Sequence, residues 1–354
     1  MEMSSTITQK KSPIKRVGSF ALKLISVLLA TLIIVVTALL AVMWVLARGP
    51  SPTAQRLFVM SVKETSAVGF LANIYLSDAE IESILRHSEP AEELYSMDTS
   101  LISIPAAVPV HPGYESAQAA SDDNSNLIAD GIERHEIKGS AYRGIMLVVH
   151  DPKRIIVSSP DRFGSVGASL IDMVAKSGAI AGINGGGFED PDGTGWGGIP
   201  DGIVIKNGKL EWGAGSGYVN VIGFDADGIL HVGTMTPTAA MNLGLQWACS
   251  FGPTLISNGV ALTKEQARSG INPRTAIGQR ADGAVLLLVV DGRQIDSLGA
   301  TFEDLIKIFL DFGAVNAANL DGGSSTLMVI NGEIVNHCAS VVGPRPLPTA
   351  FLVI

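Results

Sequence analysis

The longest apolar run lies near the N-terminus. From Leu24 to Leu46 the chain has 23 consecutive uncharged residues. As a helix, with a rise of about 1.5 Å per residue, this run would extend about 34 Å, which is enough to cross the apolar layer of a bilayer. A cleavable signal peptide has a shorter apolar region that ends at small residues, whereas this run ends in Met43–Leu46. The pattern therefore predicts a transmembrane helix that stays attached as a signal anchor.

The next part of the chain alternates between helical and irregular patterns. Between Gln55 and His87, apolar residues recur at helical spacing, and Ser77 with Asp78 can cap a helix start. We expect membrane-proximal helices whose apolar stripe packs against the protein, with a stalk or partner surface as the alternative. From Ser88 to Asn126 the composition is polar, acidic and proline-containing, which is typical of a linker.

After Gly131 the chain becomes rich in β-branched runs separated by turn residues. Two helices interrupt these runs, one over about Val166–Lys176 and one over Phe302–Phe312, where Thr301 and Asp304 can form a capping box. Helices among hairpins predict an α+β domain around a mixed β-sheet. Strands are predicted at Gly144–Val149, Arg154–Val157, Ala179–Ile183, Val219–Phe224, Thr275–Ile277, Ala284–Val290 and Ala314–Leu320, and turns at Asn207-Gly208, Asp227-Gly228, Asn258-Gly259, Asp282-Gly283 and Asn331-Gly332.

Charge indicates how this chain is oriented. Five lysines and arginines precede the apolar run, so the positive-inside rule predicts a single-pass membrane protein with a cytoplasmic N-terminus and an extracytoplasmic remainder. After Arg48 the net charge is about −14, which argues against nucleic-acid binding. Protein partners are not indicated. The expected organisation is a cytoplasmic segment (1–23), an anchor (24–46), membrane-proximal helices (47–87), a linker (88–130) and a domain (131–354).

Neither the cysteines nor the acidic loop residues of the sequence give much support for a metal-binding site. Cys249 and Cys338 are the two cysteines, and they can either pair outside the cell or remain separate buried thiols. Neither has a short-spaced metal-ligand partner. Asp190, Asp192 and Thr194 alternate as calcium ligands do, but the loop lacks the full calcium-binding pattern. We therefore expect no metal and no cofactor.

The strongest chemical signal lies where the predicted strand Ala314–Leu320 ends. Asp321 follows this strand directly and precedes Gly322, Gly323, Ser324 and Ser325. A carboxylate fixed at a strand end, beside flexible backbone amides and hydroxyls, is suited to an active site. The alternative is an Asp-Gly hairpin turn.

Two further segments place polar groups beside strands. Asn184 is followed by three glycines, beginning with Gly185 and Gly186, which lets a ligand approach the backbone or simply forms a tight turn. Arg274 follows a proline and precedes Thr275 at the start of a predicted strand. Its planar guanidinium matches a phosphate or carboxylate group of a ligand. The alternative is an ion pair within the protein, for example with Asp321.

These segments resemble the phosphodiester glycosidase family. The motifs are Asn272–Gly278, Val315–Ser325 and Asn184–Phe188, and the resemblance covers about 131–354. The family has a third glycine where this chain has Ser324. The resemblance implies a hydrolase that cleaves a sugar, such as N-acetylglucosamine, from a phosphodiester attached at its anomeric carbon.

The chemistry of that reaction suggests a role for each group. Asp321 would act as nucleophile or as base for water, Arg274 would hold the phosphate, and Asn184 would position the sugar. Retention or inversion depends on the separation of carboxylates, and Glu189 and Asp190 are expected to be exposed rather than catalytic. The expected substrate-binding residues are Gly185, Gly186, Thr275, Gly322, Gly323, Ser324 and Ser325.

Location suggests what the substrate is. An anchored extracytoplasmic domain would meet sugar phosphodiesters in envelope polysaccharide or in chains like teichoic acid. Two alternatives remain: a glycosidase for sugars without phosphate, and a noncatalytic protein for carbohydrate binding or exopolysaccharide assembly.

Overall fold

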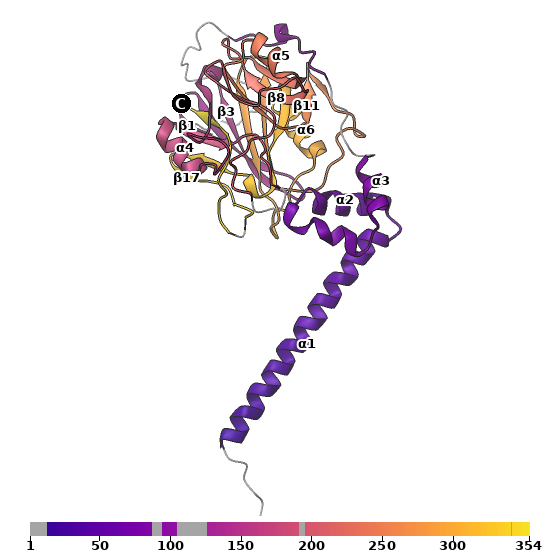
Figure 1. The fold of residues 1–354 in the computed structure, drawn as a ribbon. Coiled ribbons are helices and arrows are strands. Elements are labelled where there is room, and N and C mark those ends of the chain that lie inside the picture. The colour runs from indigo at the N-terminus through magenta and orange to yellow at the C-terminus, as the bar shows by residue number, and fades with distance from the viewer. Residues whose placement is uncertain (1–12, 87–93, 105–125, 191–194, 341) are drawn as a thin grey trace, which may run out of the picture. The chain divides into compact units, whose positions relative to one another are not determined.

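The computed structural model describes residues 13–86, 94–104, 126–190, 195–340 and 342–354. These described residues form two compact units that divide between Phe58 and Val59. The first unit contains helix α1 (Pro13–Arg48) and the start of α2 (Pro52–Lys63) (Figure 1). The segment Leu22–Arg48 of α1 has 27 residues and a mean hydropathy of 2.9. It is long and apolar enough to cross a bilayer.

The second unit confirms the α+β fold class. Its described strands form three sheets whose ladders are antiparallel. The largest sheet has, in order, β1 (Leu127–Ala129), β2 (Ile132–Lys138), β3 (Arg143–Val149), β14 (Val285–Val290), β13 (Arg274–Arg280), β15 (Ala314–Leu320), β11 (Thr254–Ser257) and β12 (Val260–Ala261).

The two smaller sheets have five described strands each. One has the order β7 (Lys209–Trp212), β6 (Val204–Lys206), β10 (Trp247–Ser250), β8 (Val219–Phe224) and β9 (Leu230–Met235). The other has the order β17 (Glu333–Ile334), β16 (Met328–Ile330), β5 (Ala181–Asn184), β18 (Ala350–Val353) and β4 (Ile155–Ser158).

The described helices of this unit are short. They are the end of α2, then α3 (Asp78–Arg86), α4 (Leu170–Ser177), α5 (Pro237–Asn242) and α6 (Phe302–Asp311), with 3-10 turns η1 (Ser66–Ile74), η2 (Thr99–Leu101), η4 (Pro152–Arg154) and η5 (Gly323–Ser325).

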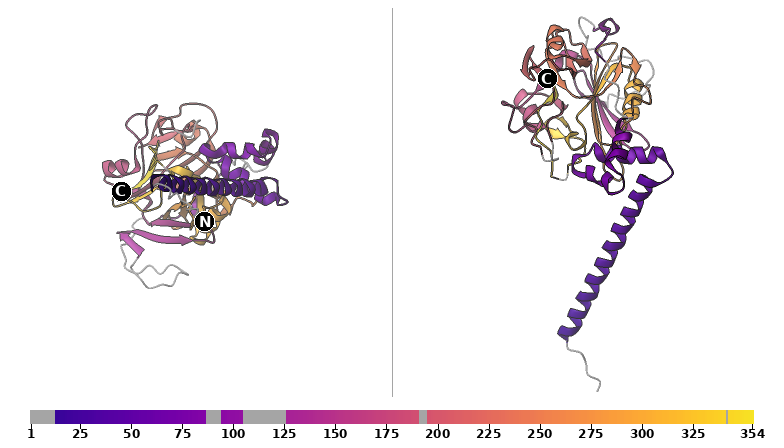
Figure 2. Two further views of the ribbon diagram at one scale, coloured as in Figure 1. Left: turned by 90° about the horizontal axis from the view of Figure 1, so that it is seen from below. Right: turned by 45° about the vertical axis from the view of Figure 1, so that its right-hand side comes forward.

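The eight-stranded sheet separates two apolar layers because side chains alternate along each strand. On β13, Ile277 faces a core shared with the smaller sheets, whereas Ala276 faces a second core that includes Phe309 of α6. Helix α6 covers this second face (Figure 2). Because Arg274 lies two residues before Ala276, strand alternation also directs its side chain toward the α6 face.

Local signals in the sequence explain the helix ends and hairpins. Thr301 and Asp304 form the predicted capping box of α6, and Gly178 ends α4 in a left-handed conformation. Helix α4 begins at Leu170, four residues later than predicted, because Ser169 caps its start through a bond from the Asp172 amide. All five predicted Asn-Gly and Asp-Gly turns have a positive φ at glycine.

The region before residue 131 contributes more to this unit than a linker does. The Tyr95 amide donates to the Thr234 carbonyl over 3.0 Å, and the Ser103 amide donates to the Ala281 carbonyl over 2.8 Å. Strand β1 also begins before Gly131 and pairs with β2. Residues 87–93 and 105–125 of the expected linker lie outside the described residues.

Candidate active site

Asn184 joins three of the segments that the sequence singled out. Its amide nitrogen donates to the backbone carbonyl of Asp321 over 2.5 Å, and its amide oxygen accepts from the Thr275 hydroxyl over 2.7 Å. The same oxygen accepts from the Leu327 amide over 3.1 Å. Asn184 is fully buried. The ends of β5, β13 and β15 therefore meet at one side chain that ties their backbones together.

Asp321 is held at this junction by its backbone, and the surroundings of its carboxyl raise the pKa of that group. Its amide donates to the Gly185 carbonyl over 3.1 Å. The pKa of the carboxyl is raised to about 6, chiefly because burial disfavours the charged form, and the negative charge of Asp201 adds to this rise. A hydrogen bond from Ser325 and the positive charge of Arg345 oppose it. A carboxylate with this pKa can accept a proton near neutral pH.

The segment after Asp321 is a 3-10 turn, not the hairpin turn that was its alternative. Gly323 has φ 59° and begins η5. The Gly323 amide donates to the Pro273 carbonyl over 2.8 Å, which fixes this turn against the start of β13. A Cβ on Gly322 would lie 2.7 Å from the same carbonyl, so glycine is needed there for close packing.

One further acidic residue, Asp201, lies near Asp321, and the sequence did not single it out. The pKa of Asp201 is raised by burial and by the charge of Glu189. Its backbone amide donates to the Gly187 carbonyl over 2.9 Å, which places Asp201 beside the glycine run. In the sequence, Pro200-Asp201-Gly202 has the composition of an ordinary turn, so no local pattern indicates this position.

Arg345 is the cation whose charge acts on Asp321. It pairs with Asp190 over 2.6 Å, and its guanidinium carbon lies 4.9 Å from the centre of the Phe188 ring. Asp190 is thus an ion-pair partner and is well buried, contrary to the expected exposure, with a side chain that is 12% exposed. Asp192 and Thr194, the other residues of the considered calcium loop, lie outside the described residues.

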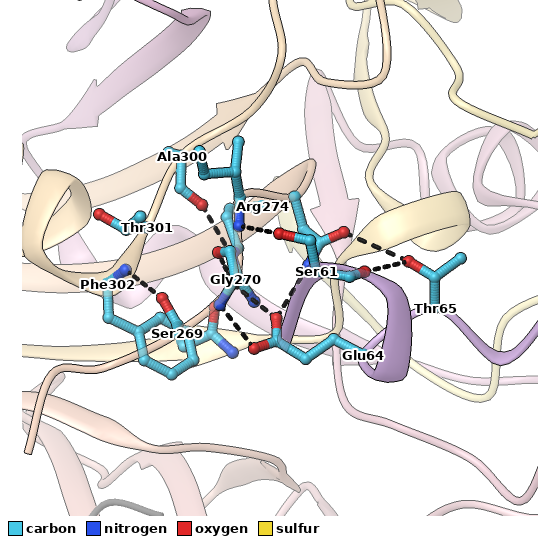
Figure 3. Close-up of polar contacts among 12 residues, drawn as sticks. Ser61, Glu64, Thr65, Ser269, Gly270, Arg274, Ala300, Thr301 and Phe302 are labelled. Carbon is cyan, nitrogen blue, oxygen red and sulfur yellow. Dashed lines mark hydrogen bonds and ion pairs between the residues drawn. The ribbon is translucent and has the colours of Figure 1, made fainter. Parts of the chain in front are cut away.

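Arg274 has an internal partner, although not Asp321. Its Nη2 donates to Glu64 Oε2 over 2.8 Å and to the Gly270 carbonyl over 2.7 Å, and its Nε donates to the Ala300 carbonyl over 3.1 Å (Figure 3). The guanidinium also lies 4.5 Å from the centre of the Phe302 ring. Arg274 and Thr275 are adjacent on a strand, so their side chains leave opposite faces, and Asn184 contacts Thr275.

Arg293 is a second arginine at this junction. It is exposed and has a left-handed backbone, with φ 60°. Its Nη1 donates to the Ser324 hydroxyl over 3.3 Å, and its Nη2 donates to the Thr65 hydroxyl over 2.7 Å. Within the described part of the chain, Arg293 has no carboxylate at ion-pair distance. Its guanidinium therefore retains an unneutralised charge beside the turn that follows Asp321.

The predicted substrate-binding glycines of the Asn184 motif are buried by the protein itself. A Cβ on Gly185 would lie 2.6 Å from the Thr349 hydroxyl, and one on Gly186 would lie 2.6 Å from the Ser250 carbonyl. The Gly186 amide donates to the Thr349 hydroxyl over 2.8 Å. Protein packing is thus sufficient to explain these glycines. Thr275 and Ser325 are also buried, whereas Ser324 is partly exposed.

The two cysteines are free, and burial raises the pKa of Cys249 to about 12. This thiol is therefore protonated and unreactive at neutral pH. Among the residues that the structure describes, no group of three or more His, Cys, Asp and Glu side chains could hold a metal ion.

Sequence comparisons give the same family as the motifs. A family model described as phosphodiester glycosidase matches residues 177–354. The prophage-derived uncharacterized protein YomE of Bacillus subtilis is 29% identical over 201 residues, which are 53% of this chain and 30% of that protein. The N-acetylglucosamine-1-phosphodiester alpha-N-acetylglucosaminidase of Bos taurus is 28% identical over 188 residues, 48% of this chain and 34% of that enzyme. The chain thus spans about a third of these relatives' length.

A solved structure supports the fold. It is the catalytic domain of zebrafish N-acetylglucosamine-1-phosphodiester alpha-N-acetylglucosaminidase, auto-inhibited by its pro-peptide. The TM-score is 0.53 at 24% sequence identity, and the match covers 67% of this chain and 86% of that domain. The family match, which spans half of the sequence and includes Asn184, Arg274 and Asp321, assigns this protein: the chain belongs to the phosphodiester glycosidase family.

Proposed function

We propose that this protein is a membrane-anchored hydrolase that cleaves a sugar from a phosphodiester at the anomeric carbon. The observation that carries the proposal is Asp321, a carboxylate with a pKa of about 6 at the junction of the three family motifs. The names of the mammalian relatives support N-acetylglucosamine as the sugar. The apolar segment Leu22–Arg48 supports an anchor, with the remaining chain outside the membrane.

In this proposal Asp321 acts in its ionised form. It either attacks the anomeric carbon or accepts a proton from the water that does so. The bond between that carbon and the phosphate oxygen breaks, its electron pair stays on the oxygen, and the products are a free sugar and a phosphomonoester. Because this leaving group is a weak base, little proton donation is needed. Asp201 assists by keeping the pKa of Asp321 near the working pH.

The phosphate requires a cation, and the contacts favour Arg293 over Arg274 for this role. Arg274 is 7% exposed at its side chain and is paired with Glu64, so its charge is already neutralised. Arg293 is exposed, and it contacts Ser324 in the turn after Asp321. We assign phosphate binding to Arg293 together with the Ser324 hydroxyl, and a supporting role to Arg274. Asn184 fixes the backbone of Asp321, so it positions the carboxylate and not the sugar.

The location of the anchor suggests the natural substrates. A catalytic domain at the outer face of a membrane would act on sugar phosphodiesters of envelope polysaccharides or of polymers like teichoic acid. After Arg48 the chain carries a net charge of about −14, which would repel polyanions at long range. Arg293 is a cation that could offset this repulsion at the site.

The test compares two chromogenic substrates with the full-length protein in detergent micelles. One is an N-acetylglucosamine 1-phosphodiester and the other is an N-acetylglucosamine glycoside without phosphate. We expect turnover of the phosphodiester, and we expect Arg293→Gln to raise its KM by about 10-fold to 100-fold, since it removes a charged hydrogen bond worth about 1.5–3 kcal/mol. The same variant should leave the KM for any residual hydrolysis of the glycoside unchanged.

The matched control is Arg162→Gln, at an exposed arginine in a different loop, and it should behave as wild type. An unchanged KM in Arg293→Gln would remove Arg293 from the phosphate site. Faster turnover of the glycoside than of the phosphodiester would favour a conventional glycosidase. Saturable binding of the phosphodiester with no product from the folded protein would favour a noncatalytic carbohydrate-binding protein.

A further inference from the structure

The end of helix α2 contacts the loop that leads into β13. We call residues 59–65 the docking segment, and all of them belong to the same compact unit as the candidate site. Ser61 accepts a hydrogen bond from the Ile271 amide over 2.9 Å. A Cβ on Gly270 would lie 2.5 Å from the Ser61 nitrogen, so the two backbones are in close contact. The docking segment is therefore packed against the loop Gly270–Arg274.

Glu64 provides the negative charge in this contact. Its Oε2 accepts from Arg274 Nη2 over 2.8 Å, and its Oε1 accepts from the Gly270 amide over 2.8 Å (Figure 3). The same Oε2 accepts from Asn272 Nδ2 over 2.9 Å. A buried guanidinium is costly unless it is paired and hydrogen-bonded. Glu64 pairs Arg274 and at the same time fixes the two ends of the loop.

Thr65 connects the docking segment to the second arginine. Its hydroxyl donates to the Ser61 carbonyl over 3.0 Å and accepts from Arg293 Nη2 over 2.7 Å. The other terminal nitrogen of Arg293 donates to Ser324, three residues after Asp321. The Thr65 hydroxyl thus holds one end of the guanidinium fork while the other end contacts the turn.

We propose that the docking segment is a positioning element of the active site, in which Glu64 fixes Arg274 with its loop and Thr65 aims Arg293 at the turn after Asp321. The segment then supports activity, although it precedes the family-matched region by more than 100 residues.

The kinetic part of the test rests on the proposed function and uses the full-length protein. Thr65→Val keeps the shape of the side chain but removes the acceptor for Arg293, whereas Thr65→Ser restores it. We expect Thr65→Val to raise KM for the N-acetylglucosamine phosphodiester about 5-fold to 10-fold with little change in kcat, because it removes one hydrogen bond to a charged group. Thr65→Ser should bring KM most of the way back to the wild-type value. Ser77→Ala, in the same part of the chain but at the start of α3, is the matched control and should leave KM unchanged.

The structural part of the test does not need catalysis. We expect Glu64→Gln to accelerate hydrogen–deuterium exchange of the Gly270 and Ile271 amides and of the Gly323 amide, compared with the wild type and with Ser77→Ala. Unchanged exchange at these amides would overturn the inference whether or not the protein is active. A rise in phosphodiester turnover on Thr65→Val or Glu64→Gln would also overturn it, because the segment would then inhibit. Absence of wild-type turnover, with faster exchange in Glu64→Gln, would count against the proposed function alone.

Discussion

Replacing Asp321 with asparagine is expected to lower kcat about 10³-fold or more while making the protein more stable at neutral pH. The loss follows because asparagine can neither attack the sugar nor accept the proton of water. The gain follows because the fold raises the pKa of this carboxyl from 3.8 to about 6, so ionising it in the folded state has a cost. That difference corresponds to roughly 3 kcal/mol at most.

The stability gained by Asp321→Asn should depend on pH. A carboxyl with a raised pKa in the folded state is neutral in both states below about pH 4, so its cost is absent there. The cost appears between about pH 4 and pH 6 and is complete above pH 6. Asp321→Asn should therefore match the wild type in thermal unfolding midpoint near pH 4 and exceed it near pH 7.5. The kcat/KM of the wild type should fall as the pH is lowered through about 6.

The control for this prediction is Asp227→Asn, at an exposed turn between β8 and β9. It should change neither turnover nor the pH dependence of unfolding. Full activity of Asp321→Asn on the phosphodiester would show that another group reacts. Equal stabilities of Asp321→Asn and wild type at both pH values would show that the carboxyl of Asp321 has an ordinary pKa.

Replacing Asn184 with alanine is expected to destabilise the fold by about 3–5 kcal/mol and to disable the site. The substitution leaves the Thr275 hydroxyl, the Leu327 amide and the Asp321 carbonyl without their partner, and each unsatisfied buried group costs about 1–3 kcal/mol. Because the Asp321 carbonyl is then free, the carboxyl also loses its fixed position. The measurements are the free energy of unfolding in urea and kcat at a temperature where the variant remains folded.

Thr275→Val provides the comparison for Asn184→Ala. It removes one hydrogen bond of the same set, so it should cost about 1–2 kcal/mol. The double variant should cost less than the sum of the two single variants, because both remove the bond between Thr275 and Asn184. A cost below about 1 kcal/mol for Asn184→Ala, or full additivity, would contradict the role of Asn184 as the shared partner.

Much of the fold was predictable because its signals are local. The boundaries of β15 were predicted as observed, and those of α6 to within one residue, because a capping box, glycine ends and an uninterrupted apolar pattern mark them. The Asn-Gly pairs at β6–β7, β11–β12 and β16–β17 adopt the left-handed conformations that such pairs favour. The family motifs suggested that Asn184, Arg274 and Asp321 act together, but the side chain that contacts Asn184 is that of Thr275, the neighbour of Arg274.

The roles of the arginines were less predictable because they depend on long-range contacts. The sequence shows that Arg274 and Thr275 leave opposite faces of a strand, but not which face meets Asn184. Glu64 lies 210 positions before Arg274, in the turn after a helix whose own pattern predicts only packing. Arg293 lies in a loop with the composition of a turn, so its proximity to Ser324 became visible only in the folded chain.

The most direct measurement is hydrolysis of the N-acetylglucosamine phosphodiester by the full-length protein in water enriched in oxygen-18, with mass analysis of both products. We expect the label to enter the anomeric hydroxyl of the sugar and to be absent from the phosphomonoester, because labelled water attacks the anomeric carbon, either directly or in an ester intermediate with Asp321. Label in the phosphomonoester would mean attack at phosphorus, and this protein would then not be a glycosidase.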